Sequence, residues 1–178
     1  MSEAGKADRT LEDVVALMAR ARSRGRTGIA RKTKPVDARP AREGEIVISV
    51  IAGEGKETQS RPARPGDWVV RNRCPETGNE EYLVRGEKFR DRYRATSVAP
   101  GPDGWQEFRP VGKELRFIFL PPEEGAFTFT APWGEAMVVR PGDAILQDPK
   151  DEKDVYRVAA GSFAYTYEVV AAADRSRP

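Results

Sequence analysis

The stretch that decides the fold is RPGDWVV at Arg64–Val70, which recurs 76 residues later as RPGDAIL at Arg140–Leu146. Both copies continue in parallel, with a Tyr-x-Val strand pattern and then a Phe-x-x-x-Tyr pair: Tyr82, Val84, Phe89 and Tyr93, then Tyr156, Val158, Phe163 and Tyr167. The offset is 76 residues at the Pro-Gly-Asp and 74 afterwards, because the second copy lacks two residues of the intervening loop. Such self-similarity indicates repeated structural units. We therefore expect two tandem repeats, residues 29–98 and 105–172, joined by the turn-rich segment 99–104.

The residues shared by the two copies predict local structure directly. Pro-Gly is typical of a type II turn, because proline presets φ and glycine adopts the positive φ that follows. The next residue, Asp67 or Asp143, can accept backbone N–H bonds within its turn. An apolar run then predicts a buried strand, and a second strand returns at Glu81–Val84 or Val155–Val158. Phe and Tyr four residues apart predict a short helix with both rings on one face.

These patterns predict an α+β, β-rich fold of two tandem repeats, each with three or four strands and a short helix. A repeat of about 70 residues buries little apolar surface by itself, so the two are expected to share one core. We expect them to pack about a pseudo-twofold axis.

Residues 1–28 are expected to form a separate N-terminal helix and basic arm. Leu11, Val14, Val15 and Met18 recur at the spacing of one apolar helix face. Thr10 is a suitable N-cap, because an acidic residue follows it at the third position, as in a capping box.

The arm is strongly basic although the whole chain carries a net charge of only +2. Seven basic side chains and no acid lie between residues 20 and 34: Arg20, Arg22, Arg24, Arg26, Arg31, Lys32 and Lys34. One interpretation is a solvated, partly disordered leader whose short helix docks on the body. The other is contact with the phosphates of nucleic acid or another polyanion. No aromatic residue lies within residues 1–67, so such binding would be electrostatic and largely independent of sequence.

Two interpretations also apply to the repeated motif. The first is a folding unit, in which each aspartate serves only as a turn acceptor. The second is a ligand site between the repeats, lined by Asp67, Trp68, Trp133 and Asp143.

Composition excludes much familiar enzyme chemistry. The chain has no histidine and a single cysteine, Cys74, which removes His-based nucleophile pairs, an intrachain disulfide and all-thiolate metal centres. The carboxylate runs around residues 76–81 and 148–154 are typical of solvated hairpin tips, so we expect no metal and no cofactor. No secretory signal and no apolar run of about 20 residues is present, which predicts a cytoplasmic protein that does not enter the membrane.

The repeated spacing resembles that of the PGDYG family, small proteins common in phages, prophages and bacteria that have no established activity. The resemblance rests on Pro65–Val70, Glu81–Val84, Phe89 and Tyr93. It extends to a basic entry strand formed by Arg31, Lys32, Lys34, Pro35 and Val36. In the second copy, Phe127–Thr130 and the turn Trp133-Gly134-Glu135 match, but Ala144 stands where the family usually has an aromatic residue. The resemblance implies no catalytic residue.

Two functional classes follow from these observations. The first is a non-enzymatic accessory or binding protein that recognises a protein partner or a polyanion and that the resemblance implies to be phage-related. The alternative is a protein that binds or acts on a small molecule or nucleotide at a site between the two repeats. This class includes enzymes. An aromatic-walled pocket with a carboxylate from each repeat would favour the alternative. Aspartates whose carboxylates bind the backbone N–H groups of their own turns would favour the first class.

Overall fold

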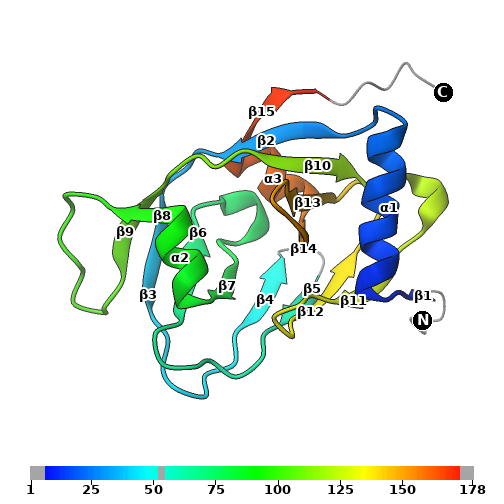
Figure 1. The fold of residues 1–178 in the computed structure, drawn as a ribbon. Helices are drawn as coiled ribbons and strands as arrows, with labels where there is room; N and C mark the ends of the chain where they lie inside the picture. Colours follow the sequence, from blue (N-terminus) through cyan, green and yellow to red (C-terminus); the bar gives the residue numbers. More distant parts are fainter. Residues whose placement is uncertain (1–6, 52–54, 173–178) are drawn as a thin grey trace.

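The structure is a computed structural model that describes residues 7–51 and 55–172 (Figure 1). The described residues form an α+β, strand-rich fold with three five-stranded sheets and three α-helices, which confirms the predicted class. The helices are α1 (Leu11–Ser23), α2 (Gly86–Arg92) and α3 (Ala160–Thr166), with short 3-10 turns η1 (Pro75–Thr77) and η2 (Pro122–Glu124).

The strands are described here by sheet, in their spatial order. Sheet 1 contains β7 (Glu81–Val84), β6 (Trp68–Asn72), β3 (Val36–Pro40), β9 (Gln106–Pro110) and β8 (Tyr93–Ala95). Sheet 2 contains β14 (Asp151–Val158), β13 (Ala144–Asp148), β10 (Leu115–Phe119), β2 (Gly28–Lys32) and β15 (Tyr167–Ala171). Sheet 3 contains β1 (Ala7–Asp8), β11 (Phe127–Thr130), β12 (Ala136–Val139), β5 (Gly55–Gln59) and β4 (Ile48–Ile51).

Sheets 1 and 2 each contain a strand from the other half of the sequence. β9 pairs with β3 in Sheet 1, with Phe108 opposite Val36. β2 pairs with β10 in Sheet 2, with Ala30 opposite Leu115, and it also pairs with β15. Ala30 accordingly packs in one apolar cluster with Leu115 and Phe117. Neither sheet is therefore complete without both halves of the chain.

Helix α1 follows the sequence prediction closely. The Thr10 hydroxyl accepts from the Asp13 N–H, and the Asp13 carboxylate accepts from the Thr10 N–H, so the capping box is present. Val14 and Met18 are fully buried, and they pack in the cluster that includes strands β10 to β14. The helix therefore docks on the body through its apolar face, at one side of the molecule (Figure 1).

The two Pro-Gly-Asp turns form as predicted. Gly66 and Gly142 both have a φ of 91°, a conformation that favours glycine. The Asp67 Oδ2 atom accepts from the Arg64 N–H at 2.9 Å, and Asp143 Oδ2 accepts from the Arg140 N–H at 2.9 Å.

The second carboxylate oxygen of each aspartate anchors the short helix that follows. Asp67 Oδ1 accepts from the Gly86 N–H at 3.4 Å, and Asp143 Oδ1 accepts from the Ala160 N–H at 3.2 Å. A Cβ atom at position 86 would lie 2.4 Å from the Gly66 carbonyl oxygen, so the first of these contacts requires glycine. Each aspartate thus joins a turn to the start of α2 or α3.

The aromatic pairs make the predicted contact, but not on one helix. The rings of Phe89 and Tyr93 stack at 5.2 Å, and those of Phe163 and Tyr167 also stack at 5.2 Å. The helices end one residue earlier, however, and Tyr93 and Tyr167 begin strands β8 and β15. This change of backbone turns the tyrosine hydroxyl groups toward the interface between Sheets 1 and 2.

Among the described residues, no helix has both the length and the apolar character needed to cross a membrane.

Candidate ligand-binding cavity

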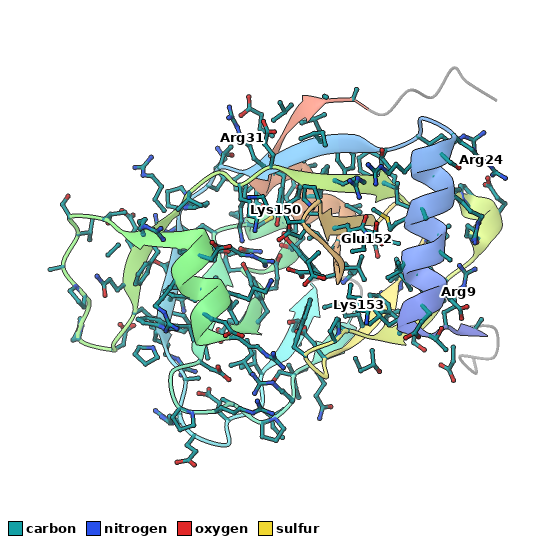
Figure 2. The ribbon with its side chains drawn as sticks, in the orientation of Figure 1. Arg9, Arg24, Arg31, Lys150, Glu152 and Lys153 are labelled. Atoms are coloured by element: carbon teal, nitrogen blue, oxygen red, sulfur yellow. The ribbon has the colours of Figure 1, made fainter. Side chains whose placement is uncertain are left out.

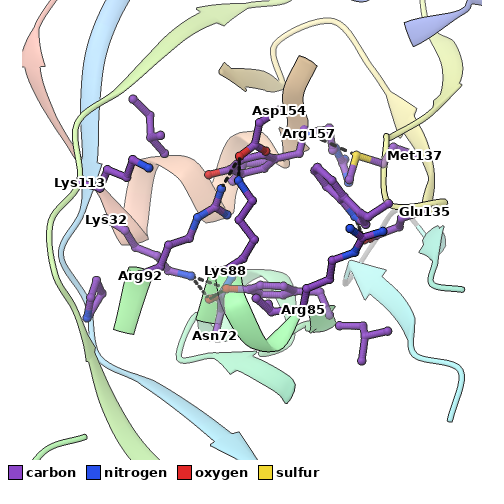
Figure 3. A pocket seen from close by; sticks show the side chains of 18 of the residues that line it. Lys32, Asn72, Arg85, Lys88, Arg92, Lys113, Glu135, Met137, Asp154 and Arg157 are labelled. Atoms are coloured by element: carbon purple, nitrogen blue, oxygen red, sulfur yellow. Dashed lines mark hydrogen bonds and ion pairs between the residues drawn. The ribbon is translucent and has the colours of Figure 1, made fainter. Parts of the chain in front are cut away.

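A cavity of about 470 Å³ lies between Sheets 1 and 2. Its walls come from β6, β7 and α2 on one side and from β14, α3 and β15 on the other, with the turn after β11 contributing Trp133. Figure 3 shows its polar side chains, in which Arg92 and Lys88 point toward Asp154 while Arg85 extends toward Glu135. This volume is within the usual range for sites that hold small organic molecules.

One wall contains a lysine surrounded by neutral oxygen atoms. Lys32 Nζ, at the end of β2, lies 2.7 Å from Asn72 Oδ1, 2.5 Å from the Tyr82 hydroxyl and 3.1 Å from the Tyr93 hydroxyl. The two hydroxyl groups lie 3.1 Å apart. Asn72 in turn donates to the buried carboxylate of Glu80 at 3.0 Å. This cluster forms because strand β2, from the first half of the chain, lies in Sheet 2, whereas both tyrosines belong to Sheet 1.

The opposing wall contains a second tyrosine pair, Tyr156 and Tyr167, whose hydroxyl groups interact with each other. The Arg92 guanidinium lies 5.3 Å from the centre of the Tyr156 ring. Arg92 and Lys88 both donate to Asp154 Oδ2, at 3.0 and 2.7 Å. These ion pairs bridge the cavity from α2 to β14, and two cations share a single carboxylate.

The two tyrosine pairs differ in their electrostatics. Burial raises the pKa of Tyr156 above its ordinary value and that of Tyr167 well above it. Burial also raises the pKa of Tyr82. At Tyr93, burial acts in the same direction, but the Lys32 charge and the hydrogen bonds from Tyr82 and Lys32 outweigh it and lower the pKa of this phenol.

Three polar atoms at the cavity have no hydrogen-bond partner in the described part of the chain, although they are buried: Arg85 Nε, Arg92 Nε and Asp154 Oδ1. Asp154 is only 3% exposed. A buried polar atom without a partner costs about 1–3 kcal/mol, so native structures rarely keep one without a reason. Two donors and one acceptor of residues in the cavity wall are therefore left without a partner in the described part of the chain.

Of the four residues assigned to a ligand site from the sequence, the structure places only Trp133 at this cavity. The carboxylates of Asp67 and Asp143 are occupied by backbone N–H groups and by an arginine each, Arg61 at 2.9 Å and Arg157 at 2.9 Å. Trp68 stacks on Phe89 at 4.4 Å in the core of Sheet 1. These three side chains stabilise the fold and lie outside the cavity wall.

The seven basic residues of the arm do not stay together. Arg20, Arg22, Arg24 and Arg26 are exposed at or just beyond the C-terminal end of α1, where Figure 2 labels Arg24. Arg31 forms an exposed ion pair with Glu168 at 3.1 Å, and the Lys34 ammonium lies 5.3 Å from the Tyr165 ring. Lys32 points into the cavity. Arg31 and Lys32 face opposite sides, because alternate side chains of strand β2 point in opposite directions.

In the described ranges, no group of three or more Cys, Asp or Glu side chains is arranged to hold a metal ion. Cys74 is buried, with its sulfur atom 4.0 Å from the Gly161 carbonyl oxygen.

Comparison with known proteins adds no relative: no family model, no curated protein and no solved structure matched the chain.

Sequence reasoning missed the residues that form the cavity wall, chiefly Lys32, Asp154 and the two tyrosine pairs. A signal was present, because Tyr82 and Tyr93 recur as Tyr156 and Tyr167 at a constant spacing. By itself that spacing indicates core packing, since a buried aromatic residue usually fills space.

Proposed function

We propose that this protein binds a small polar organic molecule in the cavity between Sheets 1 and 2. The observation that carries the proposal is the set of three unpartnered, buried polar atoms at one cavity: Arg85 Nε, Arg92 Nε and Asp154 Oδ1. A core that evolved only for stability would fill this volume with apolar side chains and pair these atoms.

The chemistry of the wall defines the class of molecule. The free N–H groups of Arg85 and Arg92 suit oxygen acceptors such as a carboxylate, a phosphate or a carbonyl group. The free oxygen of Asp154 suits a hydroxyl or amino donor. The rings of Tyr156 and Trp133, with centroids 6.3 Å apart, provide an apolar surface for a planar group. The expected ligand is therefore a small planar compound with anionic or carbonyl oxygens and at least one donor.

The proposal includes the tandem repeat and its pseudo-twofold arrangement. Sheets 1 and 2 support it, because each has a central strand, β3 or β10, flanked on one side by its own hairpin and on the other by a strand from the opposite half. The two Asp-anchored turns and the two tyrosine pairs also support it. Membership of the PGDYG family remains a prediction.

The test is to identify what the native protein carries. The protein is purified without denaturation, its small molecules are extracted and analysed by mass spectrometry, and the Asp154→Asn variant is treated identically. We expect one compound to be enriched in the wild type and depleted in this variant. Asp91→Asn serves as the control, because the Asp91 side chain is 56% exposed and lies outside the cavity wall.

Depletion of the same compound by Asp91→Asn would contradict a site at Asp154. Absence of any enriched compound from the wild type, followed by no thermal stabilisation in a screen of planar carboxylates and phosphates, would contradict the binding function itself.

A second candidate function is polyanion binding by the end of α1. Four exposed arginines, Arg20, Arg22, Arg24 and Arg26, support it. The log–log salt dependence of duplex DNA binding steepens by roughly 0.9 for each phosphate contacted. Four arginines would therefore give a slope of at most about −4.

The experiment for this second candidate compares two charge-matched variants by fluorescence anisotropy with duplex DNA at two salt concentrations. One variant replaces these four arginines with Gln, and the other replaces four exposed arginines elsewhere: Arg42, Arg64, Arg90 and Arg94. We expect the first variant to lose most of the salt-dependent binding and the second to keep it. Equal loss in both variants, or no binding by the wild type at low salt, would contradict a specific role for α1.

A further inference from the structure

In the cluster around Lys32, the hydrogen-bond donors outnumber the acceptor atoms. The Lys32 ammonium has three N–H donors, and its three neighbours are Asn72 Oδ1 and the hydroxyl oxygens of Tyr82 and Tyr93. All three donors are therefore used, and both phenolic oxygens act as acceptors.

The phenolic proton of Tyr82 has an acceptor within this cluster. The Tyr82 hydroxyl lies 3.3 Å from Asn72 Oδ1 and 3.1 Å from the Tyr93 hydroxyl, so it donates to one of them. Tyr93 accepts from Lys32, and its own proton can go to the Tyr82 oxygen when Tyr82 donates to Asn72; the described residues show no other hydrogen-bond acceptor for it. When Tyr82 donates to Tyr93, the Tyr93 hydroxyl can donate its own proton to a molecule in the cavity.

From this geometry we propose that Tyr93 is the acid–base residue of the cavity, which gives its phenolic proton to a bound oxyanion or takes the proton back. In the forward step, the Tyr93 O–H bond breaks, its electron pair stays on the phenolate oxygen, and the proton forms a new O–H bond on the ligand. The Lys32 ammonium and the Tyr82 hydroxyl stabilise the phenolate. The ligand class is a phenolate, an enolate or another delocalised oxyanion, and this inference rests on the proposed binding function.

The surroundings of Tyr93 on every side support the assignment. Lys32 approaches from β2, Tyr82 from β7, Arg92 from α2, and Tyr156 and Tyr167 from Sheet 2. Two of these five groups are cations, the other three are neutral phenols, and the lowered pKa of Tyr93 agrees with that balance. Glu80 lies behind Tyr82 and Asn72, so its carboxylate faces Asn72 and Thr77.

The first experiment needs no ligand. The chain has five tyrosines, and their ionisation is followed by phenolate absorbance as the pH rises from neutral to alkaline. We expect the first ionisation below the ordinary value of about 10. Tyr93→Phe should remove this step and Lys32→Met should shift it upward. Tyr165→Phe is the matched control, because Tyr165 is exposed and lies outside the cavity wall.

An early step that persists in Tyr93→Phe would overturn the inference, as would an early step that disappears in Tyr165→Phe. NMR of tyrosines labelled at the ring carbon that bears the hydroxyl reads each phenol separately in the wild type. That measurement decides the question even where Tyr93→Phe does not fold.

The second experiment tests whether the Tyr93 hydroxyl donates its proton in a hydrogen bond to a bound oxyanion, with 4-nitrophenolate as the probe. Its affinity for the wild type should fall by about tenfold per pH unit above the Tyr93 ionisation, because the phenolate no longer donates and adds a like charge. Tyr93→Phe should bind roughly ten- to a hundredfold more weakly, with no pH dependence in this range.

The outcomes of this second experiment separate the two proposals. Binding with the same pH profile in the wild type and in Tyr93→Phe would overturn the inference and leave the binding function intact. Failure of the wild type to bind the probe at any pH would contradict both the binding of such oxyanions and the transfer step, while the ligand-free titration would still report on Tyr93 itself.

Discussion

The two tyrosine pairs hold the same positions relative to their short helices: Tyr82 and Tyr93 belong to residues 29–98, and Tyr156 and Tyr167 belong to residues 105–172. Both pairs line one cavity. The first pair has Lys32 within hydrogen-bond distance, whereas in the second pair the Arg92 guanidinium lies over the Tyr156 ring, 5.3 Å from its centre. The pKa of Tyr93 is lowered, and the pKa values of Tyr156 and Tyr167 are raised.

This comparison teaches that similar local structure can place two tyrosine pairs in different electrostatic surroundings. The Asp-anchored turn and the stacked Phe–Tyr pair place the hydroxyl groups in both halves. What differs is the side chain that the exchanged strand brings to them. β2 brings Lys32 to the first pair, while the end of β9 presents Pro110, which has no charge to bring, to the cavity wall.

The largest expected effect comes from separating the halves. A fragment of residues 1–98 retains β2 but lacks its partners β10 and β15, and Sheet 1 loses β9. We expect this fragment to aggregate or to unfold without a cooperative transition, as measured by circular dichroism in urea. Co-expression with residues 99–178 should restore a folded complex, and a cooperative transition in the isolated fragment would show that the halves are independent.

The two turn aspartates should differ in their contribution to stability. Asp143 and Arg157 form an ion pair in which both side chains are 3% exposed, whereas Arg61, the partner of Asp67, is 13% exposed. Removing one member of a fully buried pair costs about 3–5 kcal/mol. We expect that loss for Asp143→Ala and about 1–3 kcal/mol for Asp67→Ala, from urea unfolding. Equal losses would mean that the backbone contacts dominate in both turns.

The first residues of α2 and α3 offer a smaller test of the same comparison. Gly86→Ala would place a Cβ atom 2.4 Å from the Gly66 carbonyl oxygen, so we expect a loss of about 1–3 kcal/mol. The corresponding residue of the second half is already alanine, and Ala160→Gly should cost about 0.5 kcal/mol. Thermal and urea unfolding provide the measurement. Tolerance of Gly86→Ala would show that the first turn can move away from α2.

The smallest effect is the pH dependence of stability at alkaline pH. A raised tyrosine pKa contributes stability that is present below the unfolded value of about 10 and lost as the pH rises toward the folded value. Tyr167→Phe should therefore flatten the decline above pH ~10 by up to about 1.4 kcal/mol per pH unit. Unfolding free energies measured in urea at a series of alkaline pH values provide the test.

Tyr93→Phe should behave in the opposite way. In the wild type, the pKa of Tyr93 is lower in the folded state than in the unfolded state, where it is about 10. Tyr93 therefore contributes stability that grows as the pH rises from the folded pKa to the unfolded pKa, and the Tyr93→Phe variant should lack this gain. Identical pH profiles for Tyr167→Phe and Tyr93→Phe would contradict the difference between the two pairs.

Local features of this protein were predictable because their causes lie within a few residues. The capping box at Thr10 and Asp13, the positive φ of Gly66 and Gly142 and the buried strands after each turn all follow from neighbouring side chains. Rings four residues apart were expected on a helix face, and they do stack, although each tyrosine already belongs to a strand.

The cavity and its chemistry were decided by the tertiary structure. Lys32 meets Tyr93 across 61 residues, and Asp154 meets Lys88 across 66, because β2 and β9 exchange between sheets. A period-2 pattern states which face of a strand is buried but not which strand lies beside it. The sequence alone therefore determined the turns, the caps and the strand-rich class, whereas strand pairing over long separations decided which charges surround each tyrosine.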